Sequence, residues 1–87
     1  SLERDLENFI LSKLDAVEKG LKTYEGQTGR QFQVQSGRID ILAQDMDKNF
    51  VVLELKAGTA TESVLAQVLA YMADVKRELS KGRAVRE

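Results

Sequence analysis

Two acidic residues and a lysine are spaced in a way that suits metal-assisted chemistry. Asp40 and Glu54 are separated by thirteen residues, and Lys56 follows two positions after Glu54. The polar run at 45–49 predicts a tight turn, which would make the flanking segments an antiparallel pair with Asp40 opposite Glu54. Carboxylates so opposed lie roughly 5 Å apart and repel, and a divalent cation would stabilise them. Lys56 would then balance charge on a phosphate or help to activate water.

The same register also allows an interpretation without a metal ion. It places Arg38 opposite Lys56, on the face that carries the two acids. The four charges would then form a solvated ladder of salt bridges, which stabilises a protein little. A slip of one residue would separate the acids altogether. The metal site is therefore a hypothesis, with magnesium, manganese or calcium as the cations that oxygen ligands suit.

Three polar residues on predicted helices could complete such a site. Gln67 and Tyr71 are four residues apart on one shoulder of an apolar stripe centred on Val68, where they can reach a cleft at the sheet edge. Glu7 has a similar place beside Ile10 on the first helix. The structural alternatives are a surface amide beside a half-buried tyrosine, and an ordinary surface glutamate.

The composition excludes several other chemistries. The 87 residues suffice for one small domain, and a net charge of −1 gives no general attraction to nucleic acid or membranes. Cysteine and histidine are absent, which excludes thiol nucleophiles, a His general base and metals bound by Cys or His. No membrane span or targeting segment is visible, which favours a cytoplasmic location. The chain begins with Ser1, so we expect a piece of a longer protein.

Apolar spacing and glycines predict the elements that position these residues. They are a helix over 2–19, strands over 31–35, 39–43 and 51–56, and a helix from a capping box at Thr59 to about residue 80. Residues 84–87 could begin a further strand. The apolar stripe of the first helix comprises Leu2, Leu6, Phe9, Ile10, Leu14, Val17 and Leu21.

Alternation along the strands predicts which sheet face is buried. Within 31–35 the three glutamines should point one way, with Phe32 and Val34 the other way. The opposite face of the hairpin should carry the four charges together with Leu42 and Val52. We expect the second helix to cover the wholly apolar face, formed by Ile39, Ile41, Ala43, Val51, Leu53 and Leu55.

Basic residues could add a rim for phosphates around the site. Their alternative is ordinary surface charge, since the chain as a whole is nearly neutral. The candidates are Lys13, Lys19, Lys22, Arg30 and Arg38.

These residues together resemble a known signature. Asp40, Glu54 and Lys56 resemble the PD-(D/E)xK nuclease motif, with Arg38-Ile39 standing before Asp40 in place of the proline. The segment from Gln67 to Tyr71 resembles the Q-x-x-x-Y element of the RecB-like branch.

The segments 37–42 and 51–58 are similar to the nuclease domain of the NucS/EndoMS endonucleases and their relatives. The resemblance covers residues 2 to about 80. It implies an α/β, restriction-endonuclease-like core: a helix, a three-stranded antiparallel start of a mixed sheet and a helix, with the last strand incomplete or missing. The implied function is a DNA endonuclease of DNA repair that depends on Mg²⁺ or Mn²⁺. The implied site residues are Asp40, Glu54 and Glu7 at the metal, Lys56 at the attacking water, and Gln67 and Tyr71 holding the site or the DNA backbone.

Two departures from this family open a second interpretation. The sheet would keep an exposed edge, so we expect a homodimer or a longer parent protein. Nothing here corresponds to the separate DNA-binding domain of the family. The alternative function is therefore a non-catalytic assembly or DNA-tethering module that retains the nuclease fold.

Overall fold

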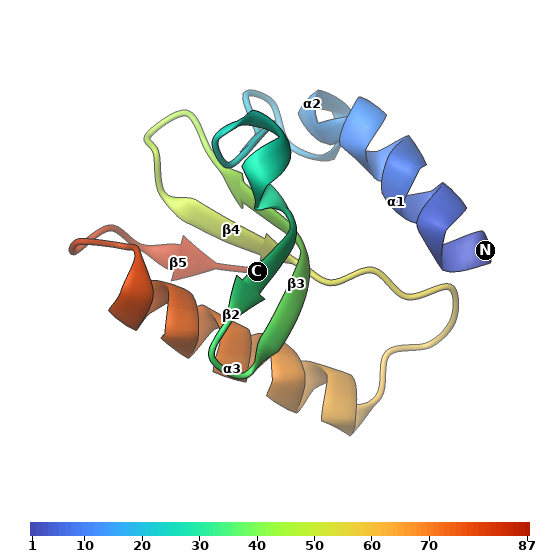
Figure 1. Ribbon diagram of the computed structural model, residues 1–87. Coiled ribbons are helices and arrows are strands. Elements are labelled where there is room, and N and C mark those ends of the chain that lie inside the picture. Colours follow the sequence, from blue (N-terminus) through green and yellow to red (C-terminus); the bar gives the residue numbers. More distant parts are fainter.

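A mixed sheet lies between two helical layers, and the computed structural model describes all of residues 1–87 (Figure 1). On one side are helices α1 (Leu2–Ser12) and α2 (Leu14–Val17), and on the other is α3 (Glu62–Glu78). None of the helices has the length and apolar character that crossing a bilayer requires. The remaining elements are β1 (Lys22–Thr23), the 3-10 helix η1 (Gly26–Gly29), β2 (Arg30–Val34), β3 (Gly37–Gln44), β4 (Phe50–Leu53) and β5 (Val85–Arg86).

The central strand, β3, pairs with three others. β1 and β2 lie antiparallel along one edge, and β4 lies antiparallel along the other. The β3–β4 register joins Ile41 to Leu53 and Ala43 to Val51, which confirms the predicted hairpin alignment. β5 adds to β4 in parallel, so the last strand, expected to be incomplete or missing, is present as a pair of residues. The protein is thus a small α/β domain with a mixed sheet.

Both faces of the sheet are buried, whereas the sequence predicted a single apolar face. Leu42 and Val52 were predicted on the charged face but are core residues, because α3 packs over them. Ile39 was predicted on the same side as Ile41, yet it packs under α3. The cluster under α3 contains Val34, Ile39, Leu42, Phe50, Val52, Val68, Tyr71 and Val75, and the cluster under α1 and α2 contains Leu14, Leu21, Ile41, Ala43 and Val51.

The first helix is shorter than predicted. α1 ends at Ser12, and the single turn of α2 starts at Leu14 after a break. The break turns the chain so that Leu14 enters the core, while the stripe residues Leu2, Phe9 and Val17 stay exposed. The predicted stripe is therefore wrong at these three positions, at Val17 because one straight helix does not continue through residue 19.

The connection from β4 to α3 also differs from the prediction. β4 ends at Leu53 instead of Lys56. Thr61 caps α3 by accepting a hydrogen bond from the backbone N–H of Val64 at 3.3 Å, so the capping box predicted at Thr59 is wrong. The segment 54–61 therefore crosses from the sheet to α3 without regular structure, which leaves its side chains free to serve a site.

Asp74 of α3 holds the turn between β2 and β3 in place through hydrogen bonds. Its carboxylate accepts hydrogen bonds from Ser36 Oγ at 2.5 Å, from Ser36 N at 2.8 Å and from Arg77 at 2.7 Å. The bond from the Ser36 hydroxyl, followed by that from Arg77, lowers the pKa of Asp74 by favouring its charged form. Gly37, in this turn, packs closely against Tyr71, since a Cβ added at Gly37 would lie 2.9 Å from the phenol oxygen.

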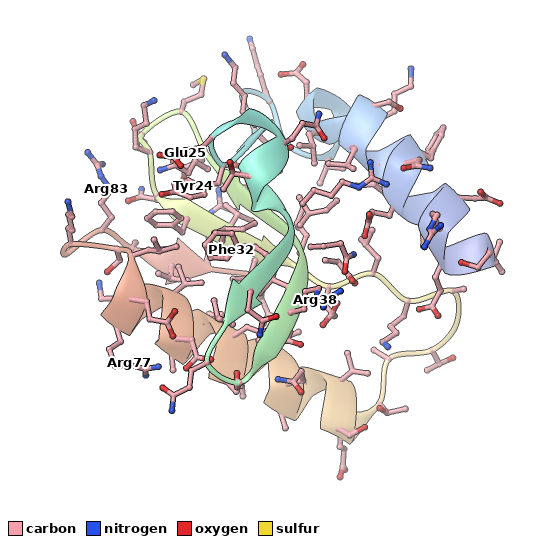
Figure 2. The ribbon with its side chains drawn as sticks, viewed as in Figure 1. Tyr24, Glu25, Phe32, Arg38, Arg77 and Arg83 are labelled. Carbon is pink, nitrogen blue, oxygen red and sulfur yellow. The ribbon has the colours of Figure 1, made fainter.

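The η1 turn packs closely on the middle of β3. Tyr24, just before η1, meets Phe32 of β2 edge-on, with ring centroids 5.8 Å apart (Figure 2). At Gly29 a Cβ would lie 2.2 Å from the carbonyl oxygen of Leu42 and 2.9 Å from the backbone nitrogen of Tyr24. Glycine is required here because backbone, which cannot move aside cheaply, occupies the space.

Replacement of Gly29 by alanine should destabilise the fold by about 1–3 kcal/mol, the usual cost of overpacking a close contact. Urea unfolding followed by circular dichroism would measure the loss. Gly58→Ala is the matched control, because nothing lies within 4 Å of a Cβ at that position. Equal stability of the two variants would contradict this account of the η1–β3 contact.

Candidate active site

The side chain of Asp40 marks the end of the pairing between β3 and β4. Its Oδ2 accepts a hydrogen bond from the backbone N–H of Leu55 at 2.8 Å. The regular pairing stops just before this point, at Ile41 and Leu53. The chain beyond Leu53 is thus held by a carboxylate instead of by strand pairing.

The carboxylates of Asp40 and Glu54 are in hydrogen-bonding contact, as the predicted register required. Burial raises the pKa of Glu54 to about 8, and its hydrogen bond and charge repulsion with Asp40 add to the rise. The positive charge of Lys56 acts in the opposite direction. Glu54 therefore keeps its proton to a higher pH than an ordinary carboxyl group does.

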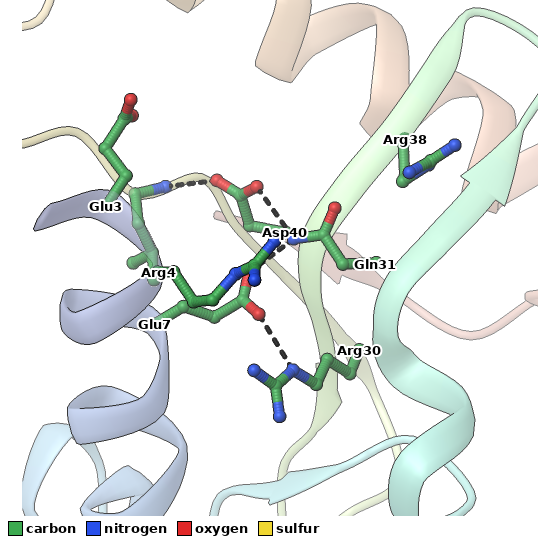
Figure 3. Close-up of a pocket in the computed structure, with 8 residues that line it drawn as sticks. Glu3, Arg4, Glu7, Arg30, Gln31, Arg38 and Asp40 are labelled. Carbon is green, nitrogen blue, oxygen red and sulfur yellow. Dashed lines mark hydrogen bonds and ion pairs between the residues drawn. The ribbon is translucent and has the colours of Figure 1, made fainter. Parts of the chain in front are cut away.

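Glu7 is held beside this pair by two consecutive residues of β2. Its Oε2 accepts a hydrogen bond from Arg30 Nε at 2.8 Å, and its Oε1 accepts one from the amide of Gln31. The same amide donates to Asp40 Oδ1 at 3.4 Å, so Gln31 lies between the two acids (Figure 3). Glu7 is only 6% exposed, which makes these partners necessary for a charged side chain.

A polar cleft opens over these side chains, between α1 and the strands β2 and β3 (Figure 3). Its volume is about 540 Å³. Arg4 and Arg38 line it without forming an ion pair, in contrast to Arg30. The lining residues are Glu3, Arg4, Glu7, Arg30, Gln31, Arg38, Asp40 and Leu55. A cleft with acidic oxygens on its floor and unpaired guanidinium groups on its rim suits a phosphate-bearing ligand.

Tyr71 lies within electrostatic reach of the acid pair. Burial and then the charge of Glu54 raise the pKa of its phenol, with Asp40 contributing in the same direction. The ring is 6% exposed and rests against Gly37. Gln67, one helical turn earlier, is half-buried and makes no side-chain hydrogen bond. The structure therefore places Tyr71 at the site and leaves the amide of Gln67 free.

Lys56 is exposed and lies outside the cleft that Asp40 lines. It borders a separate hollow of about 410 Å³ with Leu2 and Leu6 of α1. Its charge still lowers the pKa of Glu54, so the ammonium group acts on the acid pair from outside the cleft.

Sequence reasoning missed Arg4 and the role of Gln31. Arg4 precedes Glu7 by three residues on α1, and this helical spacing could have placed both at one cleft. Gln31 was predicted to point away with the other glutamines of its strand. Its φ of 50° breaks the alternation of side-chain direction along the strand. A glutamine in the sequence does not predict this backbone conformation.

The donor set of the acid pair fits a divalent cation that prefers oxygen ligands. Asp40 and Glu54 lie in contact at a position where their charges repel, and a cation between them would remove that repulsion. Glu7 does not join them directly, since Arg30 and Gln31 occupy its oxygens. Accordingly, no group of three or more acidic side chains converges on one point.

Comparison with known proteins identifies residues 2–86 with the endonuclease NucS C-terminal domain. Endonuclease NucS of Pyrococcus horikoshii is 32% identical over 76 residues, which are 87% of this chain and 28% of that protein. Endonuclease NucS of Sulfolobus acidocaldarius is 30% identical over 70 residues, which are 80% of this chain and 26% of that protein.

A solved structure has the same fold. The crystal structure of a repair endonuclease from Pyrococcus abyssi matches with a TM-score of 0.81 and 31% identity, over 97% of this chain and 34% of that chain. Across these relatives the chain spans 26% to 34% of their length.

The acid pair predicts an unusual dependence of stability on pH. A carboxyl whose pKa rises from 4.5 to about 8 on folding stabilises the protein fully below 4.5, and this contribution is lost as pH rises to about 8. Glu54→Gln should therefore gain stability relative to the parent between pH of about 5 and about 8, because a neutral amide has no charge to bury.

Urea unfolding with a chelator present, at both ends of this range, would measure the difference. Glu62→Gln, which changes an exposed acid of α3, is the matched control. A constant difference between parent and Glu54→Gln across the range would contradict the raised pKa of Glu54.

Proposed function

Because the chain belongs to the endonuclease NucS C-terminal domain family, we propose that it is a metal-dependent endodeoxyribonuclease domain. Its core would be of the restriction-endonuclease-like, PD-(D/E)xK type, and its reaction the hydrolysis of a phosphodiester bond. The observation that carries the proposal is the contact between Asp40 and Glu54 beside an arginine-lined cleft. Acidic oxygens for a cation and guanidinium groups for phosphates are the two kinds of group that this reaction needs.

Each residue of the site has a role in this proposal. Asp40 and Glu54 supply the oxygens for Mg²⁺ or Mn²⁺, which when bound gives Lewis-acid assistance to the hydrolysis. Glu7 adds negative charge at their side. Lys56, acting on Glu54 from outside the cleft, orients the attacking water or balances charge on the phosphate.

Tyr71 and Gln67 act from α3, outside the lining of the cleft. Tyr71 packs against Gly37, the residue before Arg38, and so supports the backbone from which Arg38 reaches the cleft. Gln67 has an uncommitted amide on the same side of α3, which suits a contact with the DNA backbone. Both residues thus position groups instead of exchanging protons.

The relatives named endonuclease are longer than this chain. We propose that the residues described here are the nuclease part of such a protein, working in DNA repair. The homodimer expected from the sequence stays a prediction.

Replacement of either acid should remove cleavage without unfolding the domain. Asp40→Asn and Glu54→Gln should each lower the rate of DNA cleavage in manganese by at least about 100-fold, since even indirect metal partners are worth 10–100-fold. A panel of labelled single-stranded, duplex, flap and mismatched DNA would measure it. Glu62→Gln is the control and should cleave like the parent. Folded parent protein without cleavage of any substrate would instead favour the non-catalytic assembly or tethering module.

The unpaired arginines should contribute to DNA affinity through phosphates. Arg4→Gln and Arg38→Gln should each weaken binding about equally for all sequences, and each should reduce the slope of log affinity against log salt by about 0.7–0.9. Fluorescence anisotropy with labelled DNA over a range of salt concentrations would measure both effects. Lys81→Gln, which changes an exposed cation beyond α3, should change the slope less. Equal slopes of log affinity against log salt for all three variants would mean that DNA does not bind at the cleft that Arg4 and Arg38 line.

A further inference from the structure

We propose that Gln31 is a positioning residue of this site, which ties Glu7 of α1 to Asp40 of β3 through its side-chain amide. The proposal rests on the proposed function and extends it to a residue outside the nuclease motif. Its basis is the bridge itself, because the two N–H groups of one amide donate to Glu7 and to Asp40. No other side chain links these two acids.

The backbone of β2 is distorted at the residue that makes this bridge. In a regular strand, consecutive side chains point to opposite faces. Arg30 and Gln31 are consecutive, yet both reach the carboxylate of Glu7. Gln31 has a φ of 50°, in the left-handed region that a residue other than glycine adopts only at a cost. The distortion brings a second side chain of β2 to the cleft.

The same distortion coincides with a change in the sheet. Gln31 lies between the paired positions Arg30–Ile41 and Phe32–Ile39. Ile39 and Ile41 pack on opposite faces of the sheet, so β3 changes sides at Asp40. Asp40 is thereby turned toward α1, where the amide of Gln31 meets it (Figure 3).

The chemistry of an amide suits this position better than that of a cation. Arg30 already pairs with Glu7 from the other side. A second positive side chain between the acids would neutralise the charge that a metal ion needs. The amide of Gln31 donates two hydrogen bonds and carries no charge, so it holds both carboxylates while leaving them attractive to a divalent cation.

Two variants separate the amide from the backbone. Gln31→Asn keeps an amide and tolerates the left-handed backbone, but its side chain is one methylene too short to span both acids. Gln31→Gly relieves the backbone strain and removes the side chain, but it also takes a donor from the buried Glu7, so it should fold with some loss of stability. Gln33→Asn is the matched control, since its amide bonds to the backbone carbonyls of Val34 and Gly37 away from the cleft.

The test is the affinity of the 87-residue chain for Mn²⁺ by titration calorimetry, with urea unfolding of each variant alongside. Gln31→Asn and Gln31→Gly should each weaken Mn²⁺ binding by about 10-fold or more, as loss of a partner behind the ligands does, while both variants still unfold cooperatively in urea. Gln33→Asn should bind like the parent. Parent-like affinity in both Gln31 variants would overturn the proposal.

Failure of the proposed function would give a different result in the Mn²⁺ titration. If the parent binds no Mn²⁺, or if Asp40→Asn leaves its affinity unchanged, the metal site itself is wrong and the role of Gln31 falls with it. If Asp40→Asn abolishes binding while both Gln31 variants keep it, the metal site stands and Gln31 alone is excluded.

Discussion

The hydrogen bond from the Leu55 N–H to the carboxylate of Asp40, 2.8 Å long, is the contact on which the arrangement of the site depends. It holds the chain just beyond the last paired residue of β4, so that the chain leaves the sheet while Glu54 is still beside Asp40. It also uses one oxygen of Asp40 and leaves the other to face α1. A regular ladder continued to Lys56 would have held these side chains at fixed strand positions instead.

The second requirement is that helices cover both faces of a small sheet. α3 brings Tyr71 to one side of the acid pair, and α1 brings Glu7 to the other. Each helix places its residue through its apolar contacts with the sheet, and Tyr71 is itself part of the core cluster under α3. The two core clusters thus serve the site by fixing the helices that flank it.

Asp74 and Glu54 are two acids whose surroundings shift their pKa values in opposite directions. Asp74 is surrounded by donors that lower its pKa, which is the pattern of a structural carboxylate. Glu54 is half-buried next to another acid, and its pKa is raised. Perturbed acids beside unpaired arginines in a cleft are typical of functional sites, which is why this pair, and not Asp74, is the candidate centre.

The sequence by itself determined the order of the longer elements, the β3–β4 register and the pairing of Asp40 with Glu54, because a polar turn and alternating apolar residues act over short distances along the chain. It also indicated Glu7 and Tyr71 through helical spacing. Only the tertiary structure decided that both sheet faces are buried, that β4 stops at Leu53 and that Gln31 enters the cleft. These outcomes depend on which helix covers which face and on one left-handed backbone residue, and local residue patterns carry no signal for either.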